Sequence, residues 1–132
     1  MTICFISSDY PESGRPVFTF VKNLVDAIAN LGNKCIVIAP FSITKNKKIH
    51  KQHEVYKTPE GYQVEVYRPN YISVSNYSVF GVNISGYFHR KVVEMTLNTL
   101  KVKPDVIYGH FWVSAYEGYN YARKNNIPLV VA

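Results

Sequence analysis

The fold is decided by one stretch, Lys103-Pro104-Asp105-Val106-Ile107-Tyr108-Gly109-His110-Phe111-Trp112. A proline and an acidic turn lead into a short apolar run, which predicts a buried strand over 105–108. Gly109 and His110 follow at the carboxyl end of this strand. In open α/β sheets, ligands bind at that edge. We therefore expect His110 to stand at the rim of a parallel sheet.

A strand, a helix and a second strand precede this stretch. The runs 2–7 and 34–39 are continuously apolar, which is typical of strands covered on both faces. Between them, apolar residues recur at helical spacing and Gly32 ends the pattern. The expected inner stripe of this helix is Val17, Val21, Leu24, Ile28 and Leu31. Such a βαβ unit crosses over in the right-handed sense, so the loops 7–16 and 40–51 should meet at one edge.

The other elements complete an α/β pattern. Strands at 54–57 and 62–68 flank the turn Pro59-Glu60-Gly61 and predict a hairpin at the sheet edge. A helix is expected over 86–100, with an inner stripe of Phe88, Val92, Val93, Met95, Leu97 and Leu100. A capping box at Ser114–Glu117 predicts a helix that ends near Asn125, and 128–132 predicts a last strand. The fold class is therefore α/β, a Rossmann-like doubly wound parallel sheet with helices on both faces and an edge hairpin.

Size and composition predict one globular domain over residues 1–132. The chain is 47% hydrophobic and 18% charged, which excludes a disordered protein. Because the sequence ends inside a predicted core strand, we expect a fragment of a longer chain. Cys4 and Cys35 lie in apolar strands without metal-ligand spacing, which favours buried reduced thiols and a cytoplasmic chain. No signal peptide and no membrane-spanning apolar run are found in the sequence.

The net charge of the chain is +6, and most of this charge comes from the segment 45–57. Five lysines stand there against Glu54: Lys45, Lys47, Lys48, Lys51 and Lys57. A solvated loop and a surface for phosphate or anionic lipid are both open readings. Nucleic-acid binding is not expected, because the basic residues cluster in one loop without interleaved aromatic residues.

Three groups of residues are candidates for chemistry. His110 is either a ligand group, with Phe111 and Trp112 as a stacking wall, or a strand-end residue that is hydrogen-bonded locally. The loop 7–15 leads into a helix and suits an anion, with Arg15 as a clamp, but it lacks both glycine-rich phosphate motifs. Loop structure is the other role for Ser7, Ser8 and Asp9. His50 and His53 have metal-ligand spacing without a third ligand, so we expect solvated side chains and no metal site.

Several of these segments together resemble a known family. They are Asp9-Tyr10-Pro11, Pro16-Val17-Phe18 with Phe20-Val21-Lys22, Leu31 to Pro40, Lys103 to Trp112, and Ile127 to Ala132. In order and spacing they are similar to the amino-terminal half of GT-B glycosyltransferases of family 4. Where that family has a glycine-rich loop, this chain has Arg15-Pro16, and Gly14 lies before the helix start.

The resemblance implies the acceptor-binding part of a retaining hexosyltransferase with a nucleotide-sugar donor and a glycan or lipid-linked acceptor. His110 matches the family histidine that contacts the transferred sugar, flanked by Gly109, Phe111 and Trp112. Gly14 and Arg15 would border the cleft, and Lys47 and Lys48 would meet a phosphate or the inner membrane surface. No cofactor is implied. The donor is held mainly by a carboxyl-terminal domain, which this sequence lacks.

The family's Glu-x7-Glu motif belongs to that absent domain. The six glutamates, at positions 12, 54, 60, 65, 94 and 117, include no pair eight residues apart. We therefore expect this chain to be inactive alone and to work with its own carboxyl-terminal domain in polysaccharide biosynthesis. The alternative is a free-standing flavodoxin-like binding module that binds a ligand or partner through the tyrosine-rich loop 70–87. The coding sequence after residue 132 distinguishes the two.

Overall fold

The computed structural model describes residues 1–11, 19–43, 52–72, 78–79 and 82–132. The helices are α1 (Thr19–Asn30), α2 (Ile84–Thr99) and α3 (Phe111–Asn125). The longer strands are β1 (Thr2–Ile6), β2 (Lys34–Ile38), β4 (His53–Lys57), β5 (Gln63–Tyr67), β9 (Val106–Gly109) and β10 (Leu129–Val131). Four two-residue strands complete the fold, namely β3 (Phe41–Ser42), β6 (Asn70–Tyr71), β7 (Ser78–Val79) and β8 (Val82–Asn83).

The main sheet has the strand order β10-β9-β1-β2-β5-β4. Its first five strands are parallel to their neighbours, and β4 pairs antiparallel with β5 at one edge. The expected parallel sheet with an edge hairpin is confirmed. Strand β1 lies between β2 and β9, so the chain winds outward from it in two directions. Ile6 at its carboxyl end is in register with Ile38 of β2 and Gly109 of β9.

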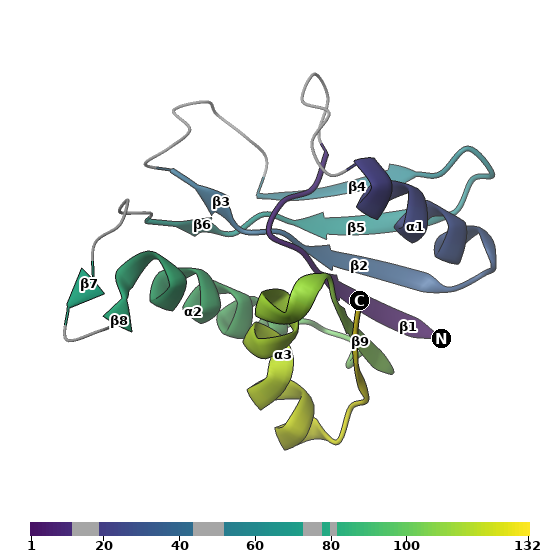
Figure 1. The fold of residues 1–132 in the computed structure, drawn as a ribbon. Helices are drawn as coiled ribbons and strands as arrows, with labels where there is room; N and C mark the ends of the chain where they lie inside the picture. Colours follow the sequence, from purple (N-terminus) through teal and green to yellow (C-terminus); the bar gives the residue numbers. More distant parts are fainter. Residues whose placement is uncertain (12–18, 44–51, 73–77, 80–81) are drawn as a thin grey trace.

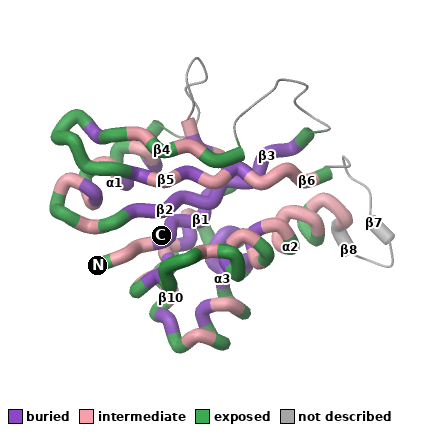
Figure 2. Tube along the Cα trace, turned by 180° about the vertical axis from the view of Figure 1, so that it is seen from behind, coloured by how far each residue is buried: buried purple, intermediate pink, exposed green. Residues whose placement is uncertain are grey.

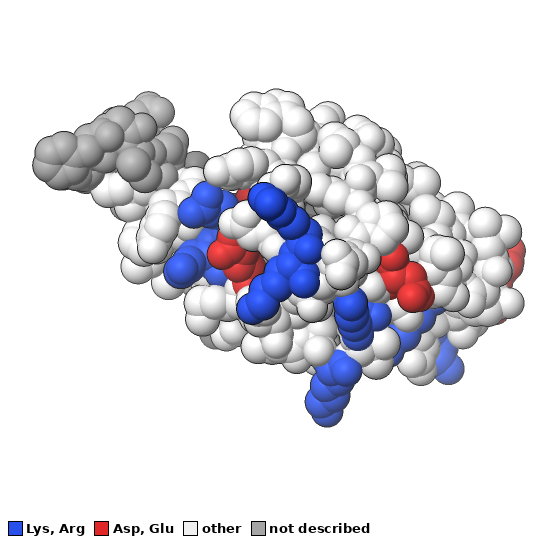
Figure 3. Space-filling view, turned by 90° about the horizontal axis from the view of Figure 1, so that it is seen from below, with Lys and Arg blue, Asp and Glu red and all other residues white. Residues whose placement is uncertain are grey.

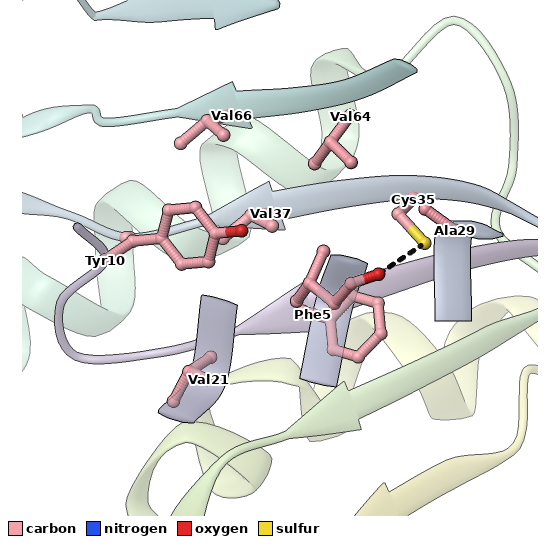
Figure 4. Packing of buried hydrophobic residues seen from close by; sticks show 10 residues of the cluster. Phe5, Tyr10, Val21, Ala29, Cys35, Val37, Val64 and Val66 are labelled. Carbon is pink, nitrogen blue, oxygen red and sulfur yellow. Dashed lines mark hydrogen bonds between the residues drawn. The ribbon is translucent and has the colours of Figure 1, made fainter. Parts of the chain in front are cut away.

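Helices cover the sheet on both faces (Figure 1). Helix α1 packs on one face against β1, β2 and β5, where Val37, Val64 and Val66 meet side chains of α1 and the loop after β1 (Figure 4). Helices α2 and α3 pack on the other face, where Leu97 and Ala122 join the alternate residues of the same strands. Buried positions are concentrated in β1 and β2, between the two helical layers (Figure 2). The doubly wound arrangement follows, because these strands are apolar on both sides.

The inner stripe of α1 differs from the expected one. Val21, Val25 and Ala29 are its buried residues, while Leu24 and Ile28 flank them. Leu31 is 82% exposed because the helix ends at Asn30, and Gly32 follows in the left-handed conformation at φ 94°. Val17 lies outside the described residues. The predicted helical period is confirmed. The predicted centre of the buried face is wrong by about one position, because the small side chain of Ala29 lets this side of the helix approach the sheet.

Helix α2 matches its expected stripe in part. Val93 and Leu97 are buried, and Leu100 is partly buried just after the helix. Met95, which we expected inside, is 61% exposed. The helix therefore presents a narrower apolar face to the sheet than its sequence offers.

Helix α3 begins four residues earlier than expected. Its N-cap is His110, and Ser114 and Glu117 lie inside the helix rather than forming a capping box. The earlier start is possible because partners outside the helix accept from its first N–H groups. The N–H of His110 donates to Ile6 O at 2.9 Å, and that of Phe111 donates to Ala132 O at 2.7 Å. The helix ends at Asn125 as predicted, with Asn126 in the left-handed conformation.

Both cysteines are buried and reduced, as expected. Cys35 Sγ lies 3.9 Å from Val25 O (Figure 4). Burial raises the pKa of the Cys4 thiol to about 12 and, with the nearby Asp26 carboxylate, that of Cys35 to about 11. Neither thiol is a reactive nucleophile.

Candidate functional site at the carboxyl edge of the sheet

The candidate site lies where β1 and β9 end. The connection from β1 leads by α1 to β2, and the connection from β9 leads by α3 to β10, on the other side. Where two connections leave in opposite directions, the ends of the strands are the usual ligand position in such sheets. His110 follows β9 at this point, and its backbone is tied to the end of β1 through Ile6. The predicted placement of His110 at the sheet rim is confirmed.

The imidazole of His110 has aromatic neighbours on two sides. Its centroid lies 5.1 Å from that of Phe20 on α1 and 4.3 Å from that of Phe111. Both ring nitrogens are buried, and neither has a hydrogen-bond partner in the part of the chain that the structure describes. The side chain also makes no capping hydrogen bond to α3. The alternative of a locally hydrogen-bonded strand-end histidine is therefore wrong.

Burial also sets the charge of this imidazole. Removal from water lowers the pKa of His110 below its ordinary value, because the charged form loses more hydration than the neutral form. Burial therefore favours the neutral form of the ring. A neutral imidazole offers one N–H donor and one nitrogen acceptor, which suits a hydroxyl group that both donates and accepts.

Phe111 is held in an unusual backbone conformation. Its φ is 67°, a value that costs a non-glycine residue about 1–2 kcal/mol. Such residues cluster at functional sites, where the surrounding structure maintains them. Phe111 is half exposed and Trp112 is 73% exposed beside it. The role of these two rings as a stacking wall stays a prediction.

Gly109 has a packing role that the sequence did not reveal. A Cβ on Gly109 would lie 2.4 Å from Ala115 Cα and N, which no structure tolerates. Gly118, within α3, is similarly close to the sheet, since a Cβ on it would lie 2.7 Å from Ile6 Cδ1. Both glycines let α3 approach the sheet closely. The predicted contact of Gly109 with substrate stays a prediction, while close packing by α3 accounts for the glycine.

The start of the loop after β1 is held by its own hydrogen bonds. Ser7 Oγ donates to Asp9 O at 2.7 Å, and Asp9 Oδ1 accepts from Tyr10 N at 2.8 Å. The structural role expected for Ser7 and Asp9 is supported. Tyr10 is fully buried and donates its hydroxyl to Tyr56, whose own hydroxyl donates to Asp26 Oδ1 at 2.7 Å. This chain of hydroxyls joins the loop to β4 and α1.

A buried arginine supports the same loop and was missed in the sequence. Arg68 follows β5 and is 1% exposed. Its guanidinium donates to Glu54 Oε1 at 2.5 Å and to Pro11 O at 2.9 Å. The hairpin register contained a signal for this pair, because Glu54 faces Val66 and is thus diagonal to Arg68.

Four of the predicted site residues lie outside the described residues. They are Gly14, Arg15, Lys47 and Lys48. His50 does so as well, whereas His53 lies on strand β4, where its ring stacks on Tyr67 and its Nε2 is 3.4 Å from Glu65 Oε1. Among the residues that the structure describes, no group of three or more potential ligands could hold a metal ion.

A second polar cluster lies between α2 and α3. His89 Nδ1 donates to Glu117 Oε2, and the ring of Tyr71 meets that of His89 edge-on at 4.9 Å. Glu117 is 3% exposed and Ser114 is fully buried. The local sequence predicts a helix cap for Ser114 and Glu117 and contains no signal for His89. The i, i+3 spacing of two polar residues is the same in a cap and on an inward helix face.

Comparison with known proteins supports the fold. No family model and no curated protein matches this chain. A solved structure of sucrose-phosphate synthase from Thermosynechococcus elongatus matches with a TM-score of 0.60 and 11% identity, over 99% of this chain and 61% of that chain. A second structure of that enzyme matches with a TM-score of 0.61 and 13% identity, over 98% of this chain and 32% of that chain.

This likeness shows that the chain has the fold of part of that synthase, an α/β fold of the kind that the sequence resemblance led us to expect. The chain spans less than two thirds of the length of the proteins it matches. In the part of the chain that the structure describes, no helix is long and apolar enough to cross a bilayer.

Proposed function

We propose that this chain is the acceptor-side part of a retaining hexosyltransferase, which transfers a sugar from a nucleotide-sugar to a glycan or lipid-linked acceptor. The supporting observation is His110, a buried imidazole whose two nitrogens have no hydrogen-bond partner among the described residues, at the point where the connections of a Rossmann-like sheet diverge. The nucleotide-sugar is held mainly by a second, carboxyl-terminal domain. The chain alone is therefore inactive, and the reaction takes place between the two domains.

In this proposal His110 contacts the transferred sugar. Glycosyl transfer passes through a state with positive charge on the sugar ring. An imidazole kept neutral by burial donates a hydrogen bond to a sugar hydroxyl without repelling that charge. Phe111 and Trp112 provide aromatic surface for the apolar face of a sugar ring. Gly14 and Arg15 border the cleft, and Gly109 carries His110 to its position.

In this proposal the basic segment 45–57 localises the enzyme at an anionic surface. Lys47 and Lys48 belong to a run of lysines that attracts phosphate groups and anionic lipid headgroups. A cytoplasmic enzyme that rests on the inner membrane surface through this segment would meet lipid-linked acceptors directly. The partners are thus the carboxyl-terminal domain, the acceptor and the lipid surface.

The test is transfer by the protein with its nucleotide-sugar domain. His110→Ala should lower kcat/KM for sugar transfer by about a hundredfold, the usual effect of removing a hydrogen bond made in the transition state. The matched control is His53→Ala, on the edge strand β4 away from the site. Its activity should be unchanged. Undiminished transfer by a folded His110→Ala protein contradicts the proposal.

The coding sequence after residue 132 tests the domain arrangement. A downstream domain with the Glu-x7-Glu motif supports the enzyme. A stop codon directly after Ala132 supports the free-standing binding module instead.

A further inference from the structure

The imidazole of His110 lies close to solvent and is nevertheless covered. His110 as a residue is only partly buried, whereas both of its ring nitrogens are inaccessible. Its ring centroid lies 5.1 Å from that of Phe20 and 4.3 Å from that of Phe111, and these two residues are 52% and 51% exposed. Solvent therefore begins directly beyond the two rings. The side chains beside the imidazole, and not depth in the core, keep water away from it.

A covered imidazole cannot contact a ligand. Neither ring nitrogen of His110 has a hydrogen-bond partner among the described residues, although buried polar atoms are nearly always paired. The cover that keeps water from these nitrogens also keeps any substrate group from them. A contact between His110 and a substrate therefore requires one of the covering side chains to move.

Phe111 is poorly suited to move. Its φ is 67°, and its N–H donates to Ala132 O at 2.7 Å. At positive φ the Cβ lies close to the following carbonyl oxygen, and the rotamers open to a side chain depend on the backbone. The main chain is also fixed two residues earlier, where Gly109 packs on Ala115 without room for a Cβ. Phe111 is thus a fixed side of the cover.

Phe20 has the freedom that Phe111 lacks. It lies in the first turn of α1, directly after the helix start at Thr19, and it is not one of the buried residues of this helix. Long side chains in helices have two common χ1 rotamers, and exposed side chains exchange rotamers within nanoseconds. A change of rotamer moves the Phe20 ring away from His110 without moving the backbone.

We propose that Phe20 is a gate over His110, which covers the imidazole in this structure and turns away when a substrate group takes its place. The inference rests on the proposed function only for the identity of that group, a hydroxyl of the transferred sugar. The covered position of Phe20 and contact between the sugar and His110 exclude each other. The gate therefore sets the fraction of molecules in which His110 is ready to bind.

Chemical modification of the histidines tests the gate in the chain itself. Diethyl pyrocarbonate reacts with neutral imidazoles that it can reach, and mass spectrometry of the peptides gives the rate at each histidine. Work at pH 8, above the ordinary histidine pKa of about 6.5, keeps differences in protonation out of the comparison. Phe20→Ala should raise the rate at His110 at least about tenfold, because a minor open state comprises at most about 10% of the molecules. Phe20→Leu should raise the rate less.

The same experiment contains its controls. Leu31→Ala changes another exposed apolar residue, beyond the opposite end of α1, and should leave the rate at His110 unchanged. His53, whose side chain is 48% exposed, should react rapidly in every variant. His89 is buried against Glu117 and should react more slowly than His110 in the unchanged protein. That order shows that His110 is reached by opening of the gate and not by global unfolding.

Transfer kinetics test the gate in the protein with its nucleotide-sugar domain. A ligand that binds only a minor open state has its affinity reduced by the open fraction. Phe20→Ala should therefore lower KM for the nucleotide-sugar, by up to the factor measured for the modification rate. Leu31→Ala should leave KM unchanged.

Three results overturn the inference. Equal modification of His110 with and without the Phe20 ring means that Phe20 is not the cover. A rate at His110 no greater than that at His89 in the unchanged protein means that the cover does not open. A raised KM in Phe20→Ala means that Phe20 holds the substrate. Absence of transfer in every variant, together with the expected modification rates, contradicts the proposed function and leaves the gate intact.

Discussion

At the scale of single residues, two positions set the geometry of the carboxyl edge. Gly109 has no Cβ because α3 occupies that space, and Phe111 adopts φ 67° directly after the N-cap of α3. Together they turn the chain sharply from β9 into the helix and leave the His110 ring between two aromatic rings. The unusual backbone and the unpaired imidazole occur within three residues.

Gly109→Ala should destabilise the protein by about 2–3 kcal/mol, because the added methyl group overlaps the backbone of Ala115. Chemical denaturation measures the loss in free energy of unfolding. Gly32→Asn is the matched control, since Gly32 has open space around it and asparagine tolerates its left-handed conformation. A Gly109→Ala protein as stable as Gly32→Asn contradicts the packing argument.

His110 should make stability fall on the acid side of neutrality. Its folded-state pKa is lowered, so the unfolded chain takes up the proton first as pH falls below about 6.5. Stability is then complete above this pH and decreases until the folded state is protonated as well. His110→Asn removes this contribution, so the difference between the two unfolding free energies should change between pH 8 and pH 5. Parallel stability curves contradict the prediction.

At the scale of elements, the strands and helices are joined by a few buried polar contacts as well as by apolar packing. The hydroxyl chain Tyr10–Tyr56–Asp26 links the loop after β1, the edge strand β4 and helix α1. Lys22 strengthens this junction, with Nζ 2.6 Å from Asp26 Oδ2 and 4.8 Å from the centroid of the Tyr56 ring. Asp26 of α1 therefore packs against the hairpin.

Tyr56→Phe should cost about 2 kcal/mol, because the buried Tyr10 hydroxyl loses its acceptor. Tyr10→Phe should cost about half as much, since Tyr56 keeps its bond to Asp26. The double variant should be no less stable than Tyr56→Phe, because the stranded hydroxyl is gone. Unfolding free energies of the four proteins give this double-mutant cycle. Additive losses contradict the proposed order of donors, and Tyr62→Phe, on the exposed turn, serves as control.

At the scale of the whole molecule, the fold is shared with a glycosyltransferase at 11–13% identity. The pattern of apolar strands and the crossovers is thus enough to specify this fold.

Positive charge is unevenly distributed over the surface of the molecule. From the side on which α2 and α3 lie, basic side chains stand close to acidic ones (Figure 3), and Arg90 Nε is 3.9 Å from Glu94 Oε1. The excess of positive charge comes mainly from the segment 45–57.

Lys47→Ala combined with Lys48→Ala should weaken binding to vesicles that contain phosphatidylserine by roughly thirtyfold, at about 1 kcal/mol for each lysine near an anionic surface. Co-sedimentation at low and physiological salt measures the effect, which should shrink as salt rises. Lys101→Ala combined with Lys103→Ala, in the exposed connection between α2 and β9, is the control. Equal binding by the two double variants argues against a membrane role for the segment.

Elements with local signals could be predicted from the amino-acid sequence. The apolar strands, the hairpin turn at Gly61, the helix end at Gly32 and the histidine at the end of β9 all follow from residue period and turn chemistry. These features depend on neighbours within a few positions, so a single sequence contains them.

The start of α3 and the contacts of its polar residues depend on the folded chain. Locally, Ser114 and Glu117 favour a cap, but Ile6 and Ala132 accept from the N–H groups of His110 and Phe111, and the helix starts earlier. Glu117 and Arg68 are buried because partners distant in sequence, His89, Glu54 and Pro11, satisfy them. Hydrogen bonds across long sequence separations form only when the sheet brings their partners together, so no local pattern reveals them.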